Sequence, residues 1–155
     1  MKIKLIALGQ RMPGWVEVGV SEFKKRLQGD IDYKVCECPI AKRTKTGNIK
    51  TWLNQESQII SQELSQSDYI VVLDSQGKLH STESLAARLD HWKLLGQRVA
   101  IIIGGPDGID QSIKNKANES ISLSKMTFPH PLVRIMITEQ IYRAMCILKG
   151  HPYHK

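Results

Sequence analysis

Short apolar runs recur along the chain, and each is separated from the next by a stretch long enough for a helix. A short apolar run between polar or turn-forming residues is typical of a buried β-strand. The run from Tyr69 to Leu73 is continuous rather than alternating, which indicates a strand with both faces covered. The pattern predicts five strands, which span Lys2–Gly9, Asp32–Ile40, Asp68–Asp74, Arg98–Gly105 and Ser120–Ser124.

Between these runs, apolar residues recur every three or four positions, as they do on one face of a helix. In the first such stretch, we expect Trp15, Val18, Phe23 and Leu27 to supply most of the buried face. Proline or a capping serine begins several stretches, and glycine ends two of them. The pattern predicts helices over Pro13–Leu27, Asn48–Leu64, Ser81–Gly96, Ile109–Asn118 and Pro131–Gly150.

Strand and helix patterns alternate along the whole chain, without an internal repeat, a linker or a low-complexity tract. This alternation is typical of an α/β domain with a mostly parallel sheet and helices on both faces. The chain has 155 residues, which suits one well-formed core, so we predict a single domain spanning residues 1–155. Ligands of such sheets bind beyond the carboxyl ends of the strands.

The composition is basic, with 22 Lys and Arg against 15 Asp and Glu, a net charge of +7 and a pI of about 9.4. This balance favours an anionic partner such as RNA. No apolar run is long enough to span a membrane, and the N-terminal segment lacks the features of a signal peptide. We therefore expect a cytoplasmic protein that does not enter a membrane.

Three cysteines are present, at positions 36, 38 and 146, and an odd number argues against a disulfide framework. No further metal ligands lie near Cys36 and Cys38 at a suitable spacing. We therefore predict buried structural thiols and no metal site.

Glycines cluster where the fourth predicted strand ends, in the loop Gly104–Gly108. The loop lacks the lysine of a P-loop and the spacing of a dinucleotide fingerprint, and Pro106 has no N–H to offer an anion. Its backbone suits close approach by a flat, mostly neutral group such as an adenosine. The alternative is a turn that only packs against the protein. The segments after the third and last predicted strands would converge on the same edge.

The loop after the last predicted strand combines apolar and hydroxyl side chains. Leu123, Met126 and Phe128 would line an apolar slot, and Ser124 and Thr127 would supply hydroxyls. The alternative is an ordinary loop that leads into the last helix.

The stretches "IIIGGPDGI", "SLSKMTFPHPLVRIMITEQIYRA" and "HPYHK", in this order, resemble the bacterial large-subunit ribosomal RNA pseudouridine N3-methyltransferases of the SPOUT class. The similarity covers essentially the whole chain, including the "KR" at Lys42. It implies a C-terminal trefoil knot, a homodimer and S-adenosylmethionine as the methyl donor. The implied target is N3 of a pseudouridine in a 23S rRNA stem-loop at the subunit interface, methylated on assembled ribosomes. Asp107 stands where relatives often carry glutamate, which keeps the charge.

The resemblance also implies which residues contact the cofactor. Carried over by position, these contacts fall on Leu73, Gly104, Leu123, Ser124, Lys125, Met126, Thr127 and Phe128.

The last helix and the tail carry the candidate catalytic residues. Methyl transfer requires alignment of the methyl group with N3 and loss of the imide proton. We expect Arg143 and the tail Tyr153–Lys155 to hold the target nucleotide, and His154 or a water to take the proton. A helix-end salt bridge is the alternative for Arg143. His130, between two prolines, is more typical of a structural or surface histidine than of a base.

The segment Lys42–Lys50 carries four positive charges in nine residues. Here Lys42, Arg43 and Lys45 would contact the rRNA backbone through salt-sensitive interactions. The alternative is a solvated loop.

Two rival functions are a non-catalytic ribosome- or RNA-binding factor, which needs no cofactor pocket, and a small-molecule dehydrogenase or nucleotide enzyme. The missing dinucleotide fingerprint counts against the latter.

Overall fold

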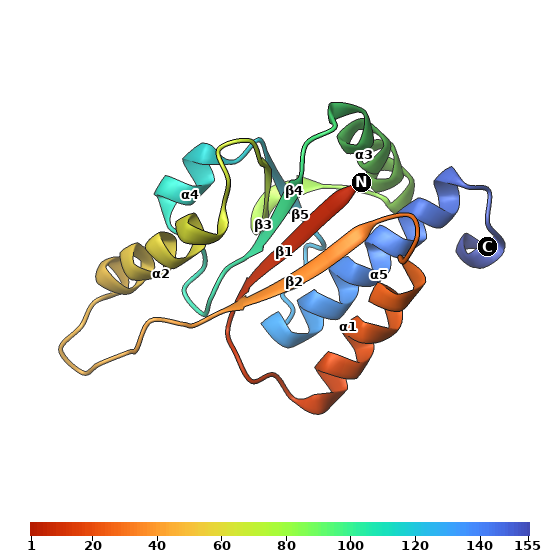
Figure 1. The fold of residues 1–155 in the computed structure, drawn as a ribbon. Coiled ribbons are helices and arrows are strands. Elements are labelled where there is room, and N and C mark those ends of the chain that lie inside the picture. Colours follow the sequence, from red (N-terminus) through yellow and green to blue (C-terminus); the bar gives the residue numbers. More distant parts are fainter.

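Five strands form one sheet in which every neighbouring pair runs parallel, in the order β2-β1-β4-β3-β5 (Figure 1). The computed structural model describes all 155 residues. It confirms the α/β prediction, and the sheet is fully parallel rather than mostly so. The central strand, β4, is buried on both faces, with no residue more than 2% exposed. The strands are β1 (Lys2–Leu8), β2 (Asp32–Cys38), β3 (Tyr69–Leu79), β4 (Val99–Ile103) and β5 (Glu119–Ser122).

Helices cover both faces of the sheet, as predicted (Figure 1). On one face, α1, α3 and α5 pack together over a large apolar cluster, and on the other, α2 and α4 cover a smaller one. A short 3₁₀ turn, η1, follows α5 and ends the chain. The helices are α1 (Gly14–Arg26), α2 (Ile49–Glu63), α3 (Thr82–Leu95), α4 (Gln111–Lys116) and α5 (His130–Leu148), and η1 spans Pro152–His154.

Capping residues place the helix ends close to the predicted positions. The Asn48 side chain accepts a hydrogen bond from the Thr51 N–H at 2.9 Å and begins α2, and Ser81 does the same for α3 through Ser84. Gly96 ends α3 in the left-handed region, with φ of +68°.

The predicted buried face of α1 is wrong at two positions. Trp15 is 55% exposed and Val18 is 70% exposed, whereas Val16 and Val20 are buried. The inward stripe runs through residues 16, 20, 23 and 27, whose spacing of four, three and four residues matches the helical period better. The helix therefore leaves an apolar surface open at Trp15 and Val18.

Strand β3 is longer than predicted, because residues 74–77 do not end it. Leu73 and Lys78 both pair with Ile121 of β5, so the four residues between them form a bulge. A Cβ on Gly77 would lie 2.6 Å from the carbonyl carbon of Ile121. Glycine at this position is what allows β3 to return to β5 after the bulge.

All three cysteines are free thiols, with Cys38 and Cys146 buried and Cys36 half-buried. No group of three His, Cys, Asp or Glu side chains is arranged to hold a metal ion. None of the helices combines the length and the apolar character needed to cross a bilayer.

We predict that Gly77→Ala lowers the free energy of unfolding by about 1–3 kcal/mol, because the new methyl group overlaps the β5 backbone. Urea denaturation at one fixed protein concentration measures this loss. Gly14→Ala is the matched control, since nothing lies within 4 Å of a Cβ at that position. An equal effect of the two substitutions would contradict this account of Gly77.

Candidate active site

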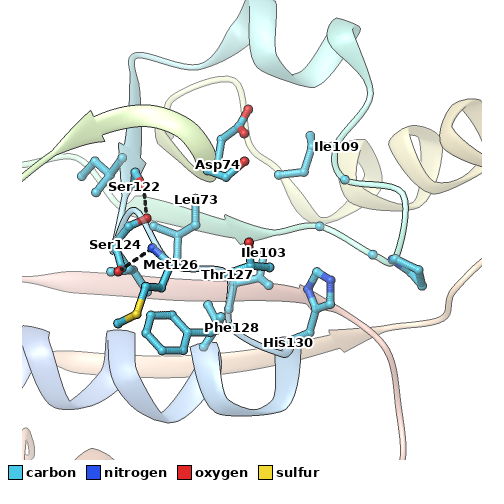
Figure 2. Close-up of a pocket in the computed structure, with 18 residues that line it drawn as sticks. Leu73, Asp74, Ile103, Ile109, Ser122, Ser124, Met126, Thr127, Phe128 and His130 are labelled. Carbon is cyan, nitrogen blue, oxygen red and sulfur yellow. Dashed lines mark hydrogen bonds between the residues drawn. The ribbon is translucent and has the colours of Figure 1, made fainter.

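A cleft of about 250 Å³ opens at the carboxyl ends of β4 and β5 and beside the start of the β3 bulge, next to the first turn of α5 (Figure 2). The three strand-end segments that were expected to converge do meet here. Of the eight residues that the resemblance assigns to the cofactor, Lys125 does not line the cleft and is exposed on the loop. The other seven line it, namely Leu73, Gly104, Leu123, Ser124, Met126, Thr127 and Phe128.

The loop Gly104–Gly108 needs its first glycine because its own chain approaches there. A Cβ on Gly104 would lie 2.5 Å from the Gly108 carbonyl oxygen. The N–H groups of Gly105 and Gly108 each donate to the other's carbonyl, at 3.2 and 3.0 Å, and Gly108 adopts φ of +87°. The loop is therefore a tight self-closed turn. The loop also lines the cleft. Packing of the loop on itself and close approach by a ligand to its backbone are therefore compatible.

Behind this loop lies a buried carboxylate that sequence analysis missed. Glu56 of α2 is 1% exposed, and its Oε2 lies 3.2 Å from the place where a Gly105 Cβ would stand. Its Oε1 accepts hydrogen bonds from the Ala41 N–H at 3.0 Å and from Arg43. The sequence pattern does indicate that Glu56 faces inward, because it lies on the same helical stripe as Trp52 and Ile60.

The loop after β5 is shaped by its own serines. Ser122 donates to the Ser124 carbonyl at 2.9 Å, and the Ser124 hydroxyl accepts from the Met126 N–H at 2.9 Å (Figure 2). Phe128 is half-buried, whereas Met126 is 70% exposed. The predicted apolar slot is therefore open to solvent along one side.

The only carboxylate that lines the cleft is Asp74, across from Phe128 and His130 (Figure 2). Burial acts to raise the pKa of Asp74, but the hydrogen bond from Lys114 and a second one from the Gln76 N–H outweigh it, and the pKa is lowered. The Lys114 ammonium lies 2.5 Å from the carboxylate, outside the cleft. Asp74 is therefore ionised at neutral pH and stands in the cleft wall as one half of an ion pair with Lys114.

His130, expected to be a structural or surface histidine, is half-buried and forms part of the cleft wall. Burial, together with the nearby Arg134 charge, lowers its pKa below the usual value of 6.5. Its imidazole is therefore neutral at pH 7 and has a nitrogen that can accept a proton. Arg134 itself is 1% exposed and donates to the carbonyls of Leu8 and Gly9 at 3.0 and 2.7 Å, which ties α5 to the end of β1.

Arg143 and the tail lie away from the cleft of their own chain. Arg143 pairs with Glu139 at 2.6 Å, as the salt-bridge alternative expects, and its guanidinium lies 4.6 Å from the Tyr153 ring centroid. His154 Nε2 lies 3.1 Å from Glu83. Arg143 lies thirteen positions after His130 on α5, a rise of about 20 Å. Arg143 and His154 therefore do not reach the cleft of their own chain.

The basic segment divides into two kinds of cation. Lys42 and Lys45 are exposed, whereas Arg43 is half-buried and pairs with Glu56 and with Asp107 at 2.6 Å. Two carboxylates already engage the Arg43 guanidinium, and its contact with rRNA stays a prediction. Lys42 and Lys45 stay available to an anionic partner.

Comparison with known proteins identifies the chain's relatives. A family model described as "Predicted SPOUT methyltransferase" matches residues 1–154. The chain belongs to the SPOUT methyltransferase family. It is 59% identical to a protein of Francisella philomiragia subsp. philomiragia over 155 residues, with each chain covered in full. It is 44% identical to one of Hahella chejuensis and 43% identical to one of Hydrogenovibrio crunogenus, with all of this chain and 99% of each relative covered.

All three relatives carry the name "Ribosomal RNA large subunit methyltransferase H". The resemblance drawn from the glycine loop, the last helix and the tail is thereby confirmed at the level of the family. For this SPOUT chain, the cleft at the carboxyl ends of β4 and β5, beside the β3 bulge, is the candidate active site.

Proposed function

We propose that this protein methylates large-subunit ribosomal RNA with S-adenosylmethionine as the methyl donor. The target is N3 of a pseudouridine in the 23S rRNA stem-loop at the subunit interface, on assembled ribosomes in the cytoplasm. One observation carries the proposal: seven of the eight residues assigned to the cofactor by resemblance line one cleft. The full-length similarity to rRNA methyltransferases supports it.

The chemistry of the cleft fits S-adenosylmethionine. No Lys or Arg side chain lines it, and Asp74 is its only ionised group, so it is poorly suited to the phosphates of a nucleotide. A ligand with an apolar body and a positive charge suits it better. Leu73, Leu123 and Phe128 would flank an adenine ring, and the backbone of Gly104 would meet its edge.

When bound, S-adenosylmethionine supplies a methyl group on a sulfonium, which is a good leaving group. The chain's own residues then have two tasks, to align N3 with that methyl group and to accept the N3 proton. His130 is neutral and lines the cleft, so it is a proton acceptor available within one chain. His154 of the partner subunit or a water is the other acceptor in this proposal.

The separation of Arg143 from the cleft supports a homodimer in this proposal. Since α5 keeps the tail of each chain away from its own cleft, Arg143 and Tyr153–Lys155 act at the cleft of a second copy. The open apolar surface at Trp15 and Val18 on α1 supports such an assembly, because a second copy would bury it. The C-terminal trefoil knot implied by the family is part of the same proposal.

Positive charge outside the cleft serves RNA docking in this proposal. Lys42 and Lys45 contact phosphates, and Tyr153 and Lys155 of the tail stack on and hold the target nucleotide. The net charge of +7 suits a ribosome-bound enzyme.

We predict that the purified protein transfers labelled methyl groups from S-adenosylmethionine to 23S rRNA in ribosomes that lack the mark. Nucleoside mass spectrometry of the digested rRNA is expected to show N3-methylated pseudouridine as the product. Arg143→Ala is expected to reduce transfer at least tenfold and to leave the affinity for S-adenosylmethionine unchanged. Ribosome binding without any transfer would instead identify a non-catalytic ribosome-binding factor.

Mixed dimers test the shared site directly. Thr127→Trp, at an exposed residue that lines the cleft, is expected to fill it, and Arg143→Ala removes the tail-side cation. Each homodimer is predicted to be inactive. In a doubly tagged mixed dimer, one chain carries Thr127→Trp and the other carries Arg143→Ala. The intact cleft of the second chain then faces the intact Arg143 of the first, so one of the two sites is complete. This dimer is expected to recover about half of wild-type activity. An inactive mixed dimer would contradict the assignment of Arg143 to the partner's cleft.

A further inference from the structure

The outer side of the glycine loop is held by an ion-pair cluster formed by Glu56, Arg43 and Asp107. None of these three residues lines the cleft, whereas Gly104, Gly105, Pro106 and Gly108 do. The loop therefore has two sides. Its inner side forms the wall of the candidate cofactor site, and its outer side rests on the ion-pair cluster.

Arg43 bridges the parts of this cluster with its planar guanidinium. One terminal nitrogen donates to Glu56 and to the Ala41 carbonyl, at 2.7 Å for the latter, and the other donates to Asp107 at 2.6 Å. The guanidinium also lies 5.3 Å from the centre of the Trp52 ring. A lysine has a single ammonium nitrogen and lacks the planar fork that places separate nitrogens against Glu56 and Asp107.

The burial of Glu56 makes its pairing with Arg43 necessary. A carboxylate that is 1% exposed requires a cationic partner, because an uncompensated buried charge is strongly destabilising. The same carboxylate lies against Gly105, where a Cβ would come within 3.2 Å of its Oε2. Glu56 thus supports the loop at Gly105, and Arg43 reaches past it to hold the loop at Asp107.

We propose that Arg43 is a positioning residue for the cofactor cleft and that Asp107 is the point at which it holds the glycine loop. This inference rests on the proposed function and refines it. Of the basic residues after β2, Lys42 and Lys45 contact RNA phosphates, whereas Arg43 positions the loop that lines the cofactor cleft. A release of Asp107 lets the loop move and weakens cofactor binding, but it removes no group that contacts RNA.

Asp107→Asn is the appropriate test, because it removes the ion pair and leaves the buried Glu56 paired with Arg43. We expect the KM for S-adenosylmethionine to rise about fivefold, with kcat at saturating cofactor and the KM for ribosomes both within about twofold of wild type. Asp107→Glu keeps the charge and is expected to restore the KM for S-adenosylmethionine. Hydrogen exchange at the Gly105 and Gly108 amides is expected to be faster in Asp107→Asn than in wild type.

Two matched variants separate this effect from a general loss of charge. Asp32→Asn neutralises an exposed carboxylate at the amino end of β2, whose nearest cation is Lys34 at 3.8 Å, and is expected to leave both KM values unchanged. Lys45→Glu is expected to show the reverse pattern, with a higher KM for ribosomes and an unchanged KM for S-adenosylmethionine.

The possible failures are distinguishable. If wild-type protein transfers methyl groups normally and Asp107→Asn leaves the KM for S-adenosylmethionine unchanged, the positioning role is overturned while the proposed function stands. An equal rise of both KM values in Asp107→Asn would also overturn it, because that result describes a general disturbance. An absence of transfer by the wild-type protein would overturn the proposed function, and this inference with it.

Discussion

The close contact between the Gly104 backbone and the Gly108 carbonyl is the constraint on which the candidate site depends. Any side chain at Gly104 would lie 2.5 Å from that oxygen, so the chain can turn sharply after β4 only with glycine there. The turn presents its backbone to the cleft on one side and to Glu56 on the other. Strand β4, helix α2 and the basic segment after β2 are thereby joined at one end of the sheet.

Much of the fold could be predicted from sequence because its signals are local. The short apolar runs of the strands and the caps at Asn48 and Ser81 each indicate an element without reference to distant residues. Features that a distant partner decides were not predicted. The bulge of β3 depends on Ile121 of β5, and the pairing of Arg43 depends on Glu56, thirteen residues further along the chain.

The candidate site was predictable to a similar extent and for similar reasons. The resemblance located seven lining residues, but the ionised Asp74 and the neutral His130 owe their states to Lys114 and to burial, which only the folded chain reveals. The lysines available to RNA lie apart from the side chains that line the cleft. The cleft contains no cation, and the exposed lysines at positions 42 and 45 lie on a neighbouring loop. This division matches a small cationic cofactor inside and an RNA outside.

The measurement that tests the central claim most directly is an NMR titration of the isotope-labelled protein with S-adenosylmethionine. The account predicts that the amide signals of Gly104, Gly105 and the segment from Leu123 to Phe128 shift together and saturate at one molecule per chain. Signals that stay unchanged at saturating concentrations, or shifts confined to another part of the surface, would contradict the assignment of this cleft to the cofactor.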